Sequence, residues 1–253
     1  MVAAALSAPV TARAQAVDHG AWDLLLQAHV DGRGLVDYDA FAQNPRFEEY
    51  LQRLARTDPA RLPRAEQLAL WINAYNAYTI ELINRHGERA SIRNINRTLG
   101  LIAGKGPWSE RMATVGGRTY TLDEIEHEIV RPRFEEPRIH FALVCAAIGC
   151  PTLRREAYTG ARLEAQLDDQ AGDFLRRTPA KNRVDVQARR VYLSPIFRWY
   201  REDFGRGNAE VGRYLARFHD GAERELLLSG AFRIDYTSYD WTLNSTDHAS
   251  RVR

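Results

Sequence analysis

The residues best suited to chemistry gather around one apolar run, IHFALV. His140 lies inside this run, and the two cysteines of the chain, Cys145 and Cys150, follow it. A thiolate becomes an effective nucleophile when a nearby histidine takes its proton and a third group orients that histidine. Glu126 and His127, slightly earlier in the chain, offer a carboxylate and a second base. This inventory fits a hydrolase or transferase that depends on a thiol, or on a histidine and a carboxylate.

The side chains that could orient such a histidine, or line a polar binding pocket, come from distant segments: Asn73, Asn76, Asp240 and Asn244. Asn73 and Asn76 are three residues apart in a predicted helix and therefore share one of its faces. A buried amide without a hydrogen bond costs roughly 1–3 kcal/mol. These two amides therefore either line a polar pocket or fix a neighbouring loop, and the sequence leaves both roles open.

The two cysteines also have a purely structural interpretation. In an exported protein with two cysteines the pair most often forms a disulfide, and the C-x4-C spacing would close a small loop. A reactive thiol and a pair of inert buried thiols are the alternatives. The spacing is not that of a C-x-x-C redox motif. A metal site built from Glu126, His127 and His140 lacks a recognised ligand spacing, so we expect no metal and no cofactor.

The run at 139–144 is short, rich in β-branched residues and bounded by Pro137 and by a Gly-Cys-Pro turn signal, which favours a buried strand. Side chains alternate along a strand. His140 and Cys145 would then lie on opposite faces and would meet only through a bulge or turn near Cys145.

A helix over residues 64–85 is predicted to form the centre of the core. It begins after Pro63, ends before Gly87 and is apolar almost all round, which is typical of a buried helix. We expect it to pack against a sheet that contains residues 139–144. A second helix, over 122–130, is marked by a capping box of Thr121 and Glu124 and carries Glu126 and His127.

Further elements are expected around this centre: helices over 19–30, 47–54, 161–176, 194–204 and 211–218, hairpins over 111–120 and 184–193, a strand over 232–236 and a loop over 91–108. No repeat or low-complexity linker divides them. The fold class is therefore a single α+β domain, with a buried central helix packed on a small, mostly antiparallel sheet and surrounded by helices. We expect residues 1–16 to be a signal-peptide remnant, 17–245 to be the domain and 246–253 to be a disordered tail.

The composition excludes some partners. The chain has 253 residues, a formal net charge of +2 and 45% hydrophobic residues, which is too weakly basic to indicate nucleic-acid binding. No apolar run approaches the roughly 20 residues of a membrane span. The small apolar N-terminus ends in two A-x-A sites, which favours a cleaved leader over an Ala-rich tail. We therefore expect a periplasmic or secreted monomer that begins near Gln15 or Val17 and binds a small molecule or peptide.

Five segments in order, LWINAYNAYTI, LDEIEH, PRIHFALVCAAIGCPTL, LSPIFRWYREDF and YDWTLN, resemble the Domain of Unknown Function 547 family of bacteria and plants. The resemblance runs from about His19 to Asn244 and implies no established activity. The residues that match the family's motifs are Asn73, Asn76, Glu126, His127, His140, Cys145, Cys150, Pro151, Asp203, Asp240 and Asn244. Papain-like and transglutaminase-like folds offer only a weak analogy, because their cysteine usually begins the core helix, which here has none.

Two function classes follow from these residues. An enzyme would gather His127 or His140, an acid and a thiol or amide around one open cleft. A non-catalytic binding module, with a structural Cys145–Cys150 disulfide, would enclose those groups and present an aromatic surface. The aromatic residues that could supply that surface are Trp199, Tyr200, Tyr239 and Trp241.

Overall fold

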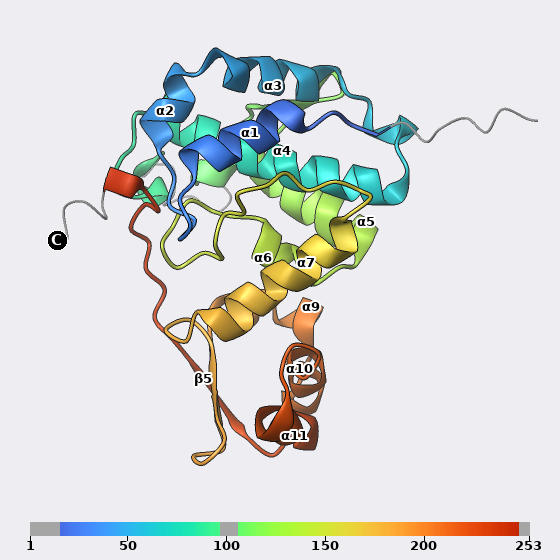
Figure 1. Cartoon of the computed structure of the whole chain (residues 1–253), viewed down its shortest axis with the longest axis vertical. Helices are drawn as coiled ribbons and strands as arrows, with labels where there is room; N and C mark the ends of the chain where they lie inside the picture. The colour runs from blue at the N-terminus through green and yellow to red at the C-terminus, as the bar shows by residue number, and fades with distance from the viewer. Residues whose placement is uncertain (1–15, 97–105, 248–253) are drawn as a thin grey trace, which may run out of the picture.

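The structure is a computed structural model in which residues 16–96 and 106–247 are described. Figure 1 shows a helical upper part and a lower part that contains a small sheet beside α10 and α11. The expected signal-peptide remnant and most of the expected tail lie outside the described residues. Within them, no helix is long and apolar enough to cross a membrane.

The elements follow one another in this order: α1 (Gly20–His29), α2 (Tyr38–Gln43), α3 (Pro45–Arg56), η1 (Pro59–Arg61), α4 (Arg64–Arg85), η2 (Ile92–Asn94), η4 (Pro107–Ser109), β1 (Ala113–Val115), β2 (Arg118–Tyr120), η5 (Glu124–Val130), α5 (Arg131–Phe134), α6 (Ile139–Ala142), α7 (Leu163–Gly172), η6 (Asp173–Arg177), β3 (Arg183–Asp185), β4 (Arg190–Leu193), α8 (Ile196–Trp199), α9 (Arg201–Phe204), α10 (Asn208–Leu215), α11 (Gly221–Ser229) and β5 (Arg233–Tyr236). The mixed α+β class is thereby confirmed.

The central helix α4 has the predicted bounds and burial. Trp71 is 2% exposed and Ile72 is fully buried. The helix packs against α2, α3, η5 and β1. These neighbours bury apolar side chains on every side of the helix, as expected of a helix without a polar face.

The strand predicted for residues 139–144 is wrong. Ile139–Ala142 forms a single helical turn, α6, which Leu143 ends with its amide on the Ile139 carbonyl at 2.9 Å. A short apolar run carries no period that separates a buried strand from a buried helical turn. Because the side chains of a helical turn point in several directions, the opposite-face rule for His140 and Cys145 does not apply.

The Asn76 side chain makes the backbone hydrogen bonds that a neighbouring strand would have made with residues 142–144. The Asn76 amide donates to the Ala142 carbonyl at 2.9 Å and accepts from the Val144 amide at 2.9 Å. Asn73 does the same for both backbone groups of Tyr158, at 2.7 and 3.0 Å. Both asparagines on α4 therefore fix loops, which is the structural role that the sequence had left open.

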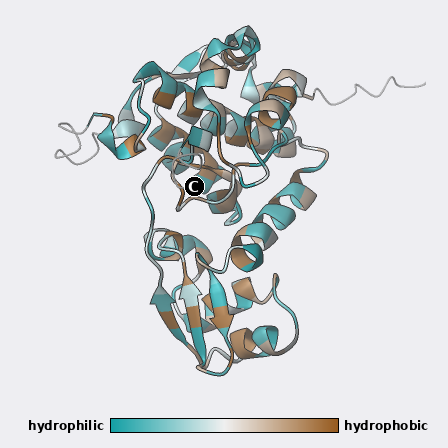
Figure 2. Ribbon diagram, turned by 60° about the vertical axis from the view of Figure 1, so that its left-hand side comes forward, coloured by the Kyte–Doolittle hydropathy of each residue, from teal (hydrophilic) through white to brown (hydrophobic). Residues whose placement is uncertain are grey.

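The strands form two small sheets rather than one under α4. β1 and β2 make the predicted hairpin, which turns at Gly116 and Gly117 with positive φ angles of 59° and 78°. β3 and β4 are antiparallel, and β5 joins β4 in parallel, with Val191 opposite Ile234. Figure 2 shows these three strands together in the lower part. One other prediction needs correction: the helix over 194–204 is broken at Tyr200 into α8 and α9. The helices α2 and α11 were not predicted.

The buried apolar residues form two clusters that meet at α6. The first contains α1–α4 and η5, and includes Ile139 and Ala142; the second contains Phe141 with residues from α7 to Phe232. Tyr239 packs against both clusters. After β5 the chain returns to the first cluster, where residues 242–246 pair with residues 36 and 146–148. The boundary between the clusters is where the site described below lies.

We predict that Asn76→Ala lowers the free energy of unfolding by about 3 kcal/mol, because it leaves one buried carbonyl and one buried amide without a partner. Urea unfolding followed by circular dichroism measures this. Gln52→Ala is the control, since its exposed amide bonds only Glu48 in the same helix, and it should change stability by no more than about 0.5 kcal/mol. Equal stabilities for the two variants would contradict the loop-fixing role.

Candidate functional site

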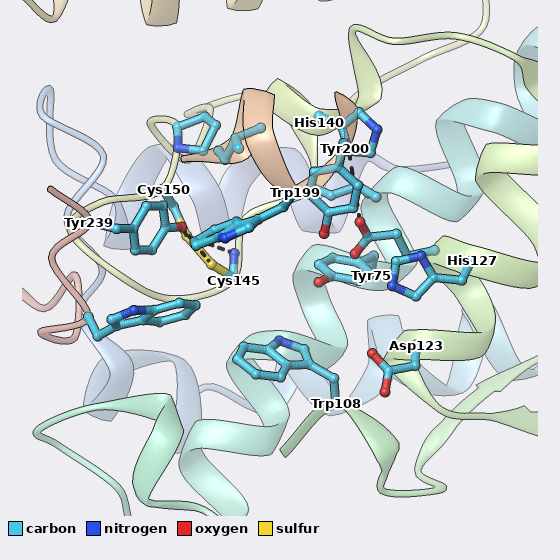
Figure 3. A pocket seen from close by; sticks show the side chains of 15 residues that line it. Tyr75, Trp108, Asp123, His127, His140, Cys145, Cys150, Trp199, Tyr200 and Tyr239 are labelled. Carbon is cyan, nitrogen blue, oxygen red and sulfur yellow. Dashed lines mark hydrogen bonds and ion pairs between the residues drawn. A yellow bond between two sulfur atoms is a disulfide. The ribbon is translucent and has the colours of Figure 1, made fainter. Parts of the chain in front are cut away.

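A cavity of about 230 Å³ lies at the boundary between the two clusters (Figure 3). Elements from both parts of the molecule line it, so its shape depends on how the clusters pack. The lining residues are Tyr75, Trp108, Asp123, Glu126, His127, His140, Leu143, Cys145, Cys150, Pro151, Ile196, Trp199, Tyr200, Tyr239 and Trp241. Glu126, His127, His140 and Cys145, which the sequence singled out, therefore converge on one cavity.

Glu126 is the buried carboxylate of this cavity. The capping box of Thr121 and Glu124 is present, with both hydrogen bonds at 2.9 Å, and the helix then widens into the π-helix η5. The Arg131 amide bonds the Glu126 carbonyl five residues back, as a π-helix requires. Burial, together with the charge of the nearby Glu126 carboxylate, raises the pKa of Tyr75 and of Tyr200 well above the usual value. Both tyrosines line the cavity beside Glu126.

His140 lies behind Glu126 and is enclosed. Its Nε2 is 2.6 Å from Asp203 Oδ2, and its Nδ1 is 3.8 Å from Glu126 Oε1. Its ring stacks on Tyr200 with a centroid distance of 3.9 Å and an angle of 24°. The side chain is 1% exposed. His140 is therefore placed to hold and to exchange a proton with carboxylates, rather than to contact a ligand over an open face.

Asp203 connects this histidine to Arg131. Arg131 donates to both carboxylate oxygens of Asp203, at 2.7 and 3.0 Å. Burial by itself would raise the pKa of Asp203, but the hydrogen bonds from His140 and Arg131 outweigh it and hold that pKa below its usual value. Asp203 therefore stays ionised. Its bonds to Arg131 and His140 connect α9 to α5 and α6. Hereafter Glu126, His140, Asp203, Tyr75 and Tyr200 are called the Glu126 network.

His127 is exposed and borders the cavity from η5. Arg131 Nη1 lies 3.2 Å from His127 Nδ1. A guanidinium can only donate, so this contact makes Nδ1 the acceptor and places the ring proton on Nε2. Asp123 is beside it. Burial and the negative charge of Glu126 raise the pKa of Asp123, and the attraction of His127 lowers it by less. The pair can serve as a proton donor and a proton acceptor at the rim.

Cys145 and Cys150 form a disulfide in the cavity wall, with the two Cα atoms 6.3 Å apart. The Tyr239 hydroxyl lies 3.1 Å from one sulfur and 3.2 Å from the other. Cys150 is 1% exposed, whereas Cys145 is partly exposed. The disulfide interpretation is thus confirmed, and neither sulfur is available as a thiolate nucleophile while the bond is intact.

The disulfide loop also carries the aromatic walls. Ile148 and Gly149 donate their amides to the Thr242 and Asp240 carbonyls, both at 2.8 Å. A Cβ atom on Gly149 would lie 2.9 Å from the Asp240 amide and from the Tyr239 ring, so only glycine allows this close approach. The loop thereby fixes the segment that contains Tyr239 and Trp241.

Four aromatic rings complete the cavity. Tyr239 lies 4.8 Å from Trp199 and 4.6 Å from Trp241, measured between ring centroids, and Trp108 lies 6.1 Å from Trp241. Trp199 is 44% exposed and stands at the rim. In Figure 3, Trp199 and Trp108 lie on opposite sides of the space between the disulfide and Tyr75. The aromatic surface expected of a binding module is therefore part of the same cavity as the ionisable groups.

The other candidate residues lie elsewhere. Asn73 and Asn76 bond backbone groups, as described above. Asp240 accepts from the Thr242 amide at 2.9 Å, and Asn244 accepts from the Tyr38 hydroxyl at 2.6 Å. Asp240 and Asn244 border a separate cavity of about 660 Å³ on the other side of Cys150. None of these four residues lines the cavity that holds Glu126. Within the described ranges, no group of three or more His, Cys, Asp or Glu has an arrangement that could hold a metal ion.

Sequence reasoning assigned no role to Tyr75, Asp123 and Arg131. The spacing of these residues in the sequence could have indicated part of the site. Asp123 and Glu126 are three residues apart and His127 and Arg131 four apart, which places each pair on one helical face. Tyr75 lies beside Asn76 in the motif of the core helix. Its position beside Glu126 depends on how η5 packs on α4, which spacing does not show.

We predict that the two histidines respond differently to alanine substitution. His140→Ala should lower the free energy of unfolding by at least about 2 kcal/mol, because it removes a buried hydrogen bond to Asp203 and the ring that stacks on Tyr200. His127→Ala, on an exposed side chain, should change it by no more than about 0.5 kcal/mol. Urea unfolding of both variants against the unaltered protein is the measurement. A marginal effect of His140→Ala would show that its enclosed hydrogen bonds contribute little.

Comparison with known proteins gave one match. No curated protein and no solved structure matched the chain. The model of the family described as "Protein of unknown function, DUF547" matches residues 59–175, which include Glu126, His127, His140 and both cysteines. The motifs that contain Asp203 and Tyr239 follow the matched segment. The match confirms the resemblance to the Domain of Unknown Function 547 family that the sequence motifs had predicted.

Proposed function

We propose that the protein is a hydrolase that depends on a histidine and a carboxylate, with Glu126 as its general base. The observation that carries this proposal is the Glu126 network, which ends in an oriented carboxylate at the wall of a cavity. A buried carboxylate with two tyrosines beside it and a histidine behind it is an arrangement of the kind that general bases require. The convergence of two carboxylates and two histidines, Asp123, Glu126, His127 and His140, on one cavity supports it further.

The proposed step begins when Glu126 takes a proton from a water molecule, whose oxygen attacks the electrophilic centre of the substrate. His140 donates from Nε2 to Asp203, so its Nδ1 carries a lone pair that faces Glu126. The separation of 3.8 Å is long for a hydrogen bond, as is common in a site without substrate. The proton can pass to Nδ1 when the pair closes, and the ionised Asp203 stabilises the imidazolium. The proton then returns through Glu126 to the leaving group, and the His127 Nε2–H donates a hydrogen bond to that group as its negative charge develops.

The thiol-dependent form of this hydrolase is not part of the proposal, because both sulfurs are in the disulfide. The second candidate function is a non-catalytic binding module. It is favoured by the full enclosure of His140, whose Nε2 and Nδ1 both face carboxylates. Turnover separates the two candidates.

We predict that the purified protein hydrolyses at least one member of a panel of 4-nitrophenyl acetate, butyrate, phosphate and β-glucoside. Glu126→Gln keeps the size of the side chain but removes the base, so it should lower kcat by about 100- to 10,000-fold. Release of 4-nitrophenol measures the rate.

Glu128→Gln is the matched control, because Glu128 is an exposed glutamate on the same π-helix and does not line the cavity. It should retain the rate of the unaltered protein. Absence of turnover across the panel, or equal rates for Glu126→Gln and Glu128→Gln, would favour the binding module.

We also propose that the protein is exported. The A-x-A sites at the N-terminus support this, and a disulfide is typical of proteins that function in an oxidising compartment. Mass spectrometry of the native protein should find an N-terminus near Gln15 or Val17. An intact Met1 in a cytoplasmic fraction would contradict export.

A further inference from the structure

We propose that the cavity binds an organic cation, a quaternary or alkylated ammonium group, packed against Trp199 and Trp108. This inference rests on the proposed function in that it names the substrate class of the same site. Three independent features of the cavity support it: its charge, its aromatic faces and one unpaired donor.

The charged side chains at the cavity favour a cation. Asp123 and Glu126 are acidic, and among the described residues no lysine or arginine lines the cavity. Three cations beside lining residues have other partners: Arg131, Arg93 and Lys181, whose Nζ donates to the Cys150 carbonyl. Arg131 forms the bidentate ion pair with Asp203, and the Arg93 guanidinium lies 5.2 Å from the centroid of Trp241. An anionic ligand would therefore meet two carboxylates and no lysine or arginine of the described part of the chain.

The walls supply the surface that an alkylated ammonium group prefers. The face of an aromatic ring carries partial negative charge and attracts a cation within about 6 Å of the ring centroid, and tryptophan does so best. Trp199 and Trp108 lie on opposite sides of the open space (Figure 3). A methylated ammonium group has no need of strong hydrogen-bond acceptors, so ring faces and two carboxylates suffice to bind it.

The ligand should also carry an oxygen acceptor. Trp108 Nε1 is buried and has no hydrogen-bond partner within the described part of the chain. A buried N–H without an acceptor is unfavourable, and a ligand carbonyl or hydroxyl beside the ammonium group would satisfy it. The cavity volume of about 230 Å³ is slightly below the roughly 300–1,000 Å³ of common ligand sites. The ligand is therefore small, on the scale of an amino alcohol or its short ester.

The test is isothermal titration calorimetry of the intact protein with choline and with 3,3-dimethylbutan-1-ol, its neutral carbon isostere. The two probes have the same shape and hydroxyl group and differ in charge. We expect choline to bind at least about tenfold more tightly than the isostere. Trp199→Leu and Asp123→Asn should each weaken choline binding at least about fivefold.

Tyr236→Leu is the control, because Tyr236 is an aromatic residue of similar exposure, 40%, on β5 and outside the cavity lining. It should leave the affinity for choline unchanged. The inference is overturned if choline does not bind at millimolar concentration, if the isostere binds equally well, or if Trp199→Leu and Asp123→Asn both retain full affinity.

Binding is measured without turnover, so the two proposals fail separately. Choline binding in a protein that hydrolyses no ester supports the cation site and counts against the hydrolase. Turnover of neutral esters without choline binding supports the hydrolase and overturns the cation site. Binding of glucose in place of choline also overturns it, and indicates that the aromatic walls stack on a sugar ring.

Discussion

The hydrogen bond between His140 Nε2 and Asp203 Oδ2, 2.6 Å long and enclosed by protein, connects the two halves of the molecule. His140 belongs to the turn at which the two hydrophobic clusters meet, and Asp203 belongs to the short helix α9. Without this bond the buried imidazole would lose its hydrogen-bond partner, at a cost of roughly 1–3 kcal/mol, and Asp203 would keep only Arg131. Arg131 completes the link, because its guanidinium holds both Asp203 and His127.

The walls of the cavity depend on three features that fix the backbone: the hydrogen bonds of Asn76, the disulfide, and the hydrogen bonds made by the disulfide loop. Asn76 closes the hydrogen bonds that follow α6 and so directs the chain towards Cys145. The Cys145–Cys150 disulfide then closes a loop whose amides hold the returning C-terminal segment. That segment places Tyr239 against both sulfurs and Trp241 against Trp108. A polar network on one side and aromatic rings on the other are thereby held at fixed positions around one space, which is the arrangement that preorganised sites require.

Local patterns predicted the parts of this structure that local interactions determine. The apolar girth of α4, the capping box at Thr121 and the Gly116–Gly117 turn each depend on neighbours in sequence, and each is present. The run at 139–144 was predicted wrongly because a six-residue apolar segment has no period, and because the Asn76 side chain supplies what a sheet would have supplied. The bond from Asp203 to His140 joins residues far apart in sequence, so no spacing reveals it. The gathering of Glu126, His127 and His140 was predicted, whereas the enclosure of His140 and the exposure of His127 required the structure.

The central claim is that Glu126, His140 and Asp203 act as one unit, although Glu126 and Asp203 lie on opposite sides of the histidine. A double-mutant cycle of Glu126→Gln and Asp203→Asn, measured as free energies of urea unfolding, tests it without knowledge of the substrate. Groups in one hydrogen-bond network show coupling of about 0.5–3 kcal/mol, whereas independent sites add within about 0.3–0.5 kcal/mol. We predict a coupling energy of at least about 1 kcal/mol for this pair and none between Asp203→Asn and Glu128→Gln. Additivity of the Glu126 and Asp203 substitutions within about 0.3 kcal/mol would contradict the account.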